Sequence, residues 1–139
     1  MDREVISAKL ETLRRCVQRI KDKTPASAAV LLEDYDLQDI ICINLERLVQ
    51  TCVDLASHII AESDLPAPGS MSEAFERLRQ LKLIPDELAA RLTKAVGFRN
   101  VAVHAYREMD WEIVYGIITT RLADFVDFAR AVARAAELP

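Results

Sequence analysis

Apolar residues recur every three or four positions along most of the chain, and this spacing restricts it to helical folds. Ile6, Leu10, Leu13, Val17 and Ile20 are separated by steps of 4, 3, 4 and 3 residues. Such steps place them on one face of an α-helix, which turns once every 3.6 residues. No stretch alternates apolar and polar residues between turn signals, as a half-buried strand would. We therefore predict an all-α protein without strands.

Helix boundaries follow from residues that start or stop helices. Pro25 ends the first helix, because proline disfavours helical geometry in the residue before it. Ser70 followed by Glu73 is typical of a capping box, Pro85 suits a first helical position, and Asp110 is a good N-cap. Five helices are predicted: roughly residues 2–22, 36–62 with an extra turn or two from residue 27, a short helix after residue 70, 85–104, and 110–136.

The second predicted helix is apolar over a wide arc. One stripe runs through Ile41, Leu45 and Leu48, and a second stripe beside it includes Val49 and Val53. A helix of this kind is buried on more than one side, so it is either central in a bundle or also contacts a partner chain. Short connections make neighbouring helices antiparallel. We expect one domain over residues 1–139, an up-and-down bundle of four to five helices.

The composition is that of an ordinary globular protein. Hydrophobic residues make up 51% of the chain and charged residues 29%. The longest apolar run, residues 28–32, is far too short to span a bilayer. The first residues lack the basic and apolar regions of a signal peptide. We therefore expect a cytoplasmic protein that does not contact a membrane.

The cysteines and histidines do not indicate a metal site. Cys16, Cys42 and Cys52 have no CxxC spacing and lie in apolar helical segments, where we expect buried thiols. His58 and His104 are far apart and match no usual ligand spacing. Glycine-rich phosphate-binding loops are also absent from the sequence. We expect no metal, no cofactor and no ATP-using activity in this chain itself.

Residues 88–107 have an unusual charge balance. They contain four of the 18 basic residues and none of the 22 acidic residues, in a chain with a net charge of −4. One interpretation is a solvated basic helix face, and the other is a local anion-binding site. Arg99, Asn100, His104 and Tyr106 lie within this segment.

A single straight helix cannot direct these four side chains at one point. Asn100 and His104 share a face, since they are four residues apart. However, Arg99 and His104 differ by about 140°, and Tyr106 and His104 would differ by about 160°. Either the helix ends near His104 and Tyr106 turns back from the loop, or a two-fold axis brings two copies of the motif together.

The residue types suit metal-independent cleavage of RNA, in which the neighbouring 2′-hydroxyl attacks phosphorus. Histidine can act as the base or the acid near neutral pH. Arginine can stabilise the phosphoryl oxygens, and asparagine can orient the histidine or bind the phosphate. Tyrosine can donate a hydrogen bond, stack on a base or accept a covalent group. A single helical histidine is also commonly structural, so spacing by itself leaves that alternative open.

The pattern Arg99-Asn100-x-x-x-His104-x-Tyr106 resembles the Arg-x4-His-x-Tyr motif of HEPN-domain proteins, specifically the HepT-like toxins. The long second helix, the proline-containing loop after it and the position of the motif extend the resemblance to nearly the whole chain. It implies a homodimeric, metal-independent endoribonuclease that is paired with a nucleotidyltransferase antitoxin of the MntA type. It also implies that Arg99 and His104 are catalytic, that Asn100 assists, and that the antitoxin transfers AMP from ATP to Tyr106.

Other polar residues have plainer interpretations. Asp54 and His58, four residues apart, form a structural or solvated pair, or bind RNA if their helix lines the cleft. Trp111 is interpreted as a packing residue rather than a platform for a base. The acidic residues within 33–39 serve helix capping and solvation, with docking to a basic partner as the alternative.

Together these observations predict the toxin of a toxin–antitoxin module. The chain would cleave RNA to products with a 2′,3′-cyclic phosphate or its hydrolysis product, and it would be inactivated by AMPylation of Tyr106. The alternative is a non-catalytic helical module that docks a nucleotidyltransferase and presents nucleotide or substrate to it. A dimerisation domain without a ligand would leave the motif and the charge asymmetry unexplained.

Overall fold

The computed structural model describes residues 2–139, and over this range it contains seven α-helices and no strand. The elements are α1 (Arg3–Lys23), α2 (Ala28–Glu33), α3 (Tyr35–Ile60), α4 (Met71–Gln80), α5 (Asp86–His104), the short 3₁₀ turn η1 (Tyr106–Glu108), α6 (Trp111–Thr120) and α7 (Leu122–Ala135). The prediction of an all-α fold is confirmed. The predicted number of helices is too low, because two of the predicted helices are each divided in two.

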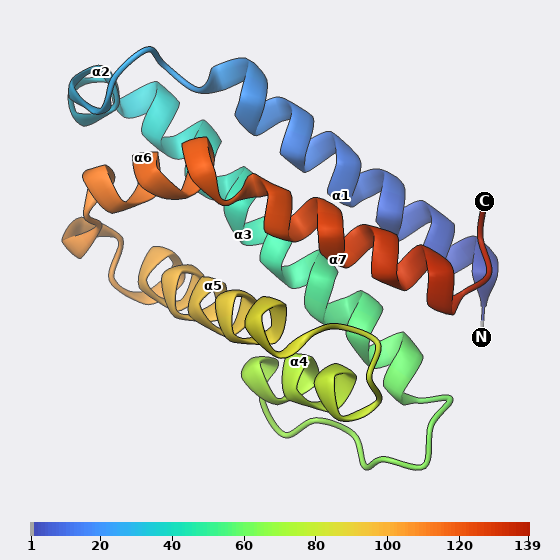
Figure 1. Cartoon of the computed structure of the whole chain (residues 1–139). Coiled ribbons are helices and arrows are strands. Elements are labelled where there is room, and N and C mark those ends of the chain that lie inside the picture. The colour runs from blue at the N-terminus through green and yellow to red at the C-terminus, as the bar shows by residue number, and fades with distance from the viewer. Residues whose placement is uncertain (1) are drawn as a thin grey trace.

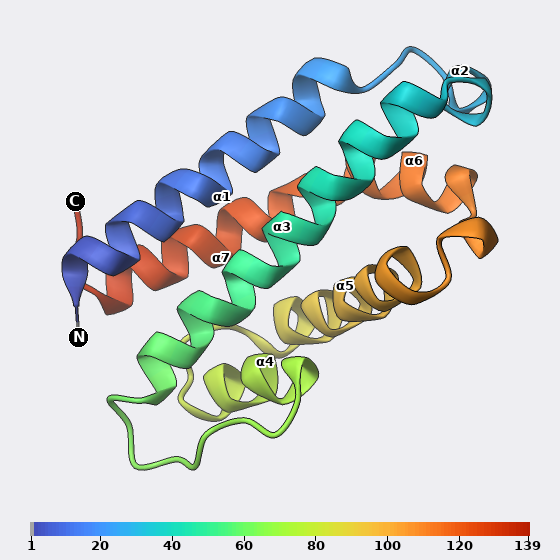
Figure 2. The same ribbon diagram turned by 180° about the vertical axis from the view of Figure 1, so that it is seen from behind.

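The long helix α3 is the centre of the molecule (Figures 1 and 2). Helix α1 runs antiparallel along it, α7 packs against both, and α4 and α5 cover a further side of α3. The short helices α2 and α6 contact each other at the opposite end from α4. Arg3 and Glu137 form an ion pair at 2.9 Å where the two ends of the chain meet. The wide apolar arc of α3 is thus buried on several sides, as its sequence predicts.

A polar cap divides α2 from α3. The carboxylate of Asp34 accepts a hydrogen bond from the backbone N–H of Leu37 at 3.0 Å, so α3 begins there. The buried side chain of Gln38 donates to the carbonyl oxygens of Leu31 and Leu32 at 2.9 and 3.3 Å. These bonds satisfy carbonyl groups that the end of α2 leaves without helical partners. The extension predicted from residue 27 is therefore a separate short helix.

We expect Asp34→Ala to lower the free energy of unfolding by about 1 kcal/mol, because the first turn of α3 loses its side-chain acceptor. Asp34→Asn is the matched control, since asparagine caps helices about as well as aspartate. Urea denaturation followed by circular dichroism measures both. Equal stability of the alanine and asparagine variants would show that this cap contributes nothing.

The segment predicted as one C-terminal helix bends at Arg121, which separates α6 from α7. Residues 117–120 are four consecutive β-branched residues, which lose side-chain freedom in a helix. The hydroxyls of Thr119 and Thr120 donate to carbonyl oxygens four residues earlier, at 2.7 and 2.6 Å. Hydrogen bonds of this kind bend helices. Arg121 then leaves helical geometry, with φ of −118° and ψ of 0°.

The starts of α4 and α5 follow from the predicted signals, with one shift. The Ser70 hydroxyl accepts from the N–H of Glu73 at 3.2 Å, and the Glu73 carboxylate accepts from the N–H of Gly69 at 2.6 Å. Pro85 is the N-cap of α5 rather than its first helical residue.

Within residues 2–139, every helix is too short or too polar to cross a membrane.

Candidate active site

The end of α5 carries three of the predicted site residues. Helix α5 stops at His104, because Ala105 adopts a non-helical conformation with φ of −144° and ψ of 45°. The chain then enters η1, so Tyr106 leaves the helical track of Arg99 and His104. The helix therefore ends at His104, as the first of the two predicted arrangements requires, in which Tyr106 belongs to the loop after the helix.

The polar groups on α5 are available to a ligand. Arg99 is half-buried, and one of its guanidinium N–H groups donates to the Asn100 side-chain oxygen over a long 3.5 Å. Asn100 and His104 are exposed. No hydrogen bond or ion pair joins the His104 side chain to another of residues 2–139. Asn100 and His104 lie on one face of α5 and are open to a ligand, whereas Arg99 is directed about 140° away from His104.

Tyr106 is held against two other helices. Its hydroxyl donates a hydrogen bond of 2.7 Å to Oδ1 of Asp39 in α3. Its ring meets Trp111 of α6 edge to face, with ring centroids 5.6 Å apart. The structure thus brings Tyr106 to Asp39, and within one chain it does not turn the hydroxyl back to His104. Trp111 is half-buried against the core, as its interpretation as a packing residue predicts.

The surroundings of Tyr106 keep its hydroxyl protonated. Burial raises the pKa of Tyr106 well above its usual range, and the hydrogen bond to Asp39 and the nearby Cys42, Asp39 and Glu46 add to this. Burial, together with the Glu46 and Asp39 carboxylates, raises the pKa of the Cys42 thiol to about 12. Both groups are therefore neutral at physiological pH.

Asp39 is a site residue that sequence reasoning missed. It lies 67 residues before Tyr106, and only the packing of η1 against α3 brings the two together. The one available signal was the acidic run within residues 33–39, which was interpreted as capping and solvation. That interpretation holds for Asp34 and fails for Asp39.

Asp54 and His58 lie far from the motif. At 1.5 Å per residue, His58 is about 28 Å further along α3 than Asp39. Asp54 forms an ion pair with Lys9 at 3.4 Å and accepts a hydrogen bond from Gln50 at 3.0 Å. The structure therefore assigns Asp54 to the contact between α1 and α3 and leaves His58 exposed at the other end of the bundle.

Potential metal ligands do not gather anywhere in the described part of the chain. Among residues 2–139, no group of three or more His, Cys, Asp and Glu side chains is placed to hold a metal ion. Cys16, Cys42 and Cys52 are free and buried, which confirms that they are core residues. The metal-independent reaction stays a prediction.

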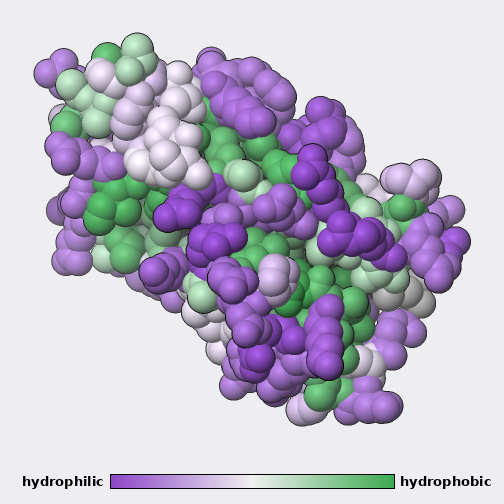
Figure 3. All heavy atoms as spheres, in the orientation of Figure 1, coloured by the Kyte–Doolittle hydropathy of each residue, from purple (hydrophilic) through white to green (hydrophobic). Residues whose placement is uncertain are grey.

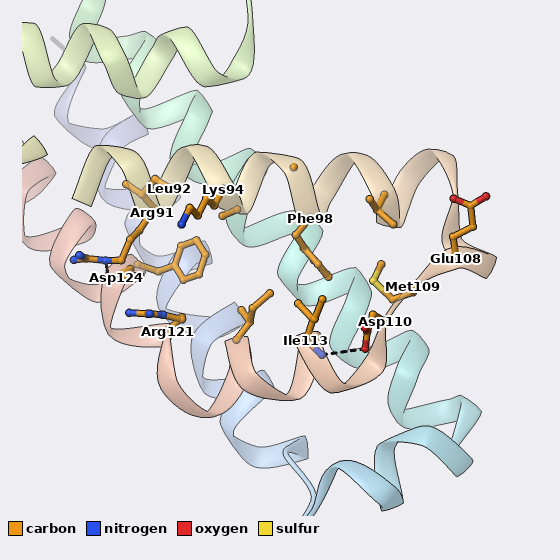
Figure 4. A pocket seen from close by; sticks show the side chains of 15 residues that line it. Arg91, Leu92, Lys94, Phe98, Glu108, Met109, Asp110, Ile113, Arg121 and Asp124 are labelled. Carbon is orange, nitrogen blue, oxygen red and sulfur yellow. Dashed lines mark hydrogen bonds and ion pairs between the residues drawn. The ribbon is translucent and has the colours of Figure 1, made fainter. Parts of the chain in front are cut away.

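An apolar cavity of about 480 Å³ lies beside the motif, between α5, α6 and α7. Phe98 points into it from α5, opposite Ile113 of α6 (Figure 4). Arg91 and Asp124 close one end with an ion pair at 2.8 Å. Val101, one turn before His104, also lines it. None of the four motif residues lines this cavity, but Phe98 and Val101, their neighbours on α5, do.

The similarity of this chain to known proteins covers most of its length, including the motif. The family described as Ribonuclease HepT-like matches residues 13–132, which include the complete motif. The mRNA nuclease HepT of Shewanella oneidensis is 36% identical over 125 residues, 90% of this chain and 93% of that protein. The tRNA nuclease HepT of Aphanizomenon flos-aquae is 25% identical over 128 residues, 92% of this chain and 87% of that protein.

Solved structures agree with the sequence comparison. The tri-AMPylated HEPN toxin of Shewanella oneidensis, in complex with an MNT antitoxin, has a TM-score of 0.89 at 34% identity. The match covers 96% of this chain and 99% of that one. A toxin–antitoxin structure with AMP-PNP has a TM-score of 0.87, also at 34% identity, and covers 95% of this chain and 99% of that one. The resemblance inferred from the motif is confirmed: this chain belongs to the HepT-like ribonuclease family and has its all-α HEPN fold.

Proposed function

We propose that this chain is the ribonuclease toxin of a toxin–antitoxin module and that AMPylation of Tyr106 inactivates it. One observation carries the proposal: Arg99, Asn100 and His104 are grouped at the end of α5 with their polar ends open, in a chain of a ribonuclease family. Its relatives are an mRNA nuclease and a tRNA nuclease, and one related toxin is AMPylated in complex with its antitoxin. RNA and ATP are cytoplasmic, and we place the protein there.

His104, Arg99 and Asn100 have different roles in the proposed RNA cleavage. His104 takes the proton from the attacking 2′-hydroxyl or gives one to the leaving oxygen. Arg99 stabilises the charge that develops on the phosphoryl oxygens, through its permanently charged planar group. Asn100 contacts Arg99 and is one turn from His104, so it orients them or binds the phosphate. The products carry a 2′,3′-cyclic phosphate, because the attacking oxygen stays bonded to phosphorus.

The active enzyme is a homodimer in which two copies meet at the α5–α6 face. Large apolar side chains are exposed there: Val101 is 38% and Ile113 61% exposed. Figure 3 shows hydrophobic surface at the end of the molecule where α2 and α6 lie. A second copy on this face covers the cavity and adds its own Arg99 and His104. The 140° between the two side chains then no longer prevents them from acting on one phosphate.

AMPylation blocks this site by charge and bulk. The adenylate adds a negative phosphate next to the motif, where it repels RNA and occupies space near Arg99. The modified Tyr106 oxygen carries no proton, so its hydrogen bond to Asp39 is also lost. The partner that supplies AMP is a nucleotidyltransferase antitoxin of the MntA type.

We expect Tyr106→Phe to yield a toxin that the antitoxin cannot modify. Phenylalanine keeps the ring that packs on Trp111 and removes only the acceptor oxygen. Intact mass after co-expression with the cognate nucleotidyltransferase should show one or more added adenylates on the wild type and none on the variant. RNA cleavage should then persist in the presence of antitoxin and ATP only for the variant.

Tyr35→Phe is the matched control, because Tyr35 is 75% exposed and lies one helical turn from Asp39. It should be modified as fast as the wild type. Adenylates on the Tyr106→Phe variant would show that another residue accepts AMP. An unmodified wild type, with a nucleotidyltransferase of verified activity, would contradict the proposed inactivation.

A further inference from the structure

Asp39 contacts the atom that the antitoxin is proposed to modify. The Tyr106 hydroxyl donates its proton to Oδ1 of Asp39 at 2.7 Å. Asp39 is exposed in the second turn of α3, so its carboxylate can exchange a proton with water. Trp111 limits the movement of the ring on the other side. The hydroxyl is therefore held in one direction, against a carboxylate.

A phenol needs a proton acceptor to react at neutral pH. The neutral hydroxyl is a weak nucleophile, and the pKa of Tyr106 is raised mainly by burial, so the phenolate fraction is very small. The titratable groups that face it from α3 are Asp39, Cys42 and Glu46, and from α6 it meets the indole of Trp111. The reaction requires one of these groups, or a group of the antitoxin, to take the proton.

Asp39 is the group in the right position. The Cys42 thiol has a pKa of about 12, so it holds its own proton. Glu46 influences Tyr106 through its charge, and no hydrogen bond joins it to the hydroxyl in the described chain. His104 is equally without a hydrogen bond to Tyr106. A general base must be within hydrogen-bond reach of the proton that it takes.

We propose that Asp39 is the proton acceptor for AMPylation of Tyr106, an inference that rests on the proposed function. The Tyr106 oxygen attacks the α-phosphorus of ATP held by the antitoxin, and a new oxygen–phosphorus bond forms. The bond between the α-phosphorus and the bridging oxygen breaks, and pyrophosphate leaves with the electron pair. The phenolic proton passes to Asp39 and then to water. The toxin thus supplies a catalytic group to the reaction that inactivates it.

The test compares rates of AMPylation of the full-length toxin by its cognate nucleotidyltransferase with ATP. We expect Asp39→Asn to lower the rate about a hundredfold, because asparagine still accepts the hydrogen bond but cannot take the proton. Asp39→Glu should recover most of the rate. Asp36→Asn, which removes an exposed carboxylate one turn away and leaves Tyr106 untouched, should react as the wild type does.

The pH dependence separates proton transfer from positioning. Without a base, only the phenolate reacts, so the ratio of the Asp39→Asn rate to the wild-type rate should rise about tenfold per pH unit between pH 7 and 9. Taking the ratio removes the antitoxin's own pH dependence. A slow variant with a constant ratio would reduce Asp39 to a positioning residue and overturn the proposal.

Two further outcomes are decisive. Equal rates for Asp39→Asn and the wild type would overturn the proposal and leave the proposed function intact. A wild type that the antitoxin does not modify would instead contradict the proposed function. Loss of AMPylation in His104→Ala, with Asp39→Asn reacting as the wild type does, would show that His104 is the base and would overturn the proposal.

Discussion

His104→Ala should abolish RNA cleavage by this protein, with the rate reduced by about 10²–10⁴-fold. The imidazole is the group of the motif that we assign as general base or acid in RNA cleavage. His104 is exposed at the last position of α5 and its side chain makes no hydrogen bond within the described chain, so truncation of this side chain costs little stability. Arg99→Ala should lose about 10²–10³-fold, because the charge on the phosphoryl oxygens is then unopposed.

The matched control is His58→Ala, which removes the other histidine of the chain. His58 is exposed and lies at the far end of α3, so this variant should cleave RNA at the wild-type rate. Cleavage is measured as initial rate on labelled RNA, and circular dichroism verifies the fold of each variant. Wild-type activity in His104→Ala would contradict the assignment of the site and favour a non-catalytic binding module.

A substrate with 2′-deoxyribose at the scissile position tests the chemistry of cleavage. It should resist the wild-type enzyme, and its cleavage would exclude attack by the 2′-hydroxyl.

The two variants also test the dimer. If each site combines residues from two copies, a mixture of Arg99→Ala and His104→Ala protomers should recover about a quarter of wild-type activity. Half of the dimers are then mixed, and each mixed dimer has one intact site. No recovery after verified exchange of protomers would place both residues of a site in one chain.

Phe128→Ala should be the most destabilising of the substitutions proposed here. Phe128 is fully buried and meets Phe75 edge to face, with ring centroids 5.8 Å apart. Removing the ring leaves a cavity between α7 and α4 and costs about 3–5 kcal/mol. This is a large share of the roughly 5–15 kcal/mol that stabilises an ordinary domain. The midpoint of thermal unfolding should fall by about 10–20 °C.

Phe128→Leu is the control, because it keeps an apolar side chain and leaves a smaller cavity, so it should lose much less. A double-mutant cycle with Phe75→Leu should show a coupling of about 0.5–1.5 kcal/mol for the aromatic pair. An alanine variant as stable as the leucine variant would show that this part of the core closes around the missing ring.

Local signals predicted the helices that local interactions define. The bounds of α1 follow from apolar spacing and Pro25, the start of α4 from Ser70 and Glu73, and the end of α5 falls at His104 as expected. The two divided helices were missed for a physical reason. At Arg121 the apolar pattern continues through the break, while bent geometry interrupts the backbone. At Asp34 the break depends on a side-chain cap and on the buried Gln38, which bonds to the end of α2.

The sequence by itself determined the fold class, the family and the four motif residues, because periodicity, caps and short motifs depend on residues close together in the chain. Only the tertiary structure decided which way Tyr106 points. Its partner Asp39 is 67 residues away, and no local rule pairs them. Packing of η1 between α3 and α6 creates that contact, buries the phenol and raises its pKa. The environment of Tyr106 is therefore a property of how three distant segments pack together.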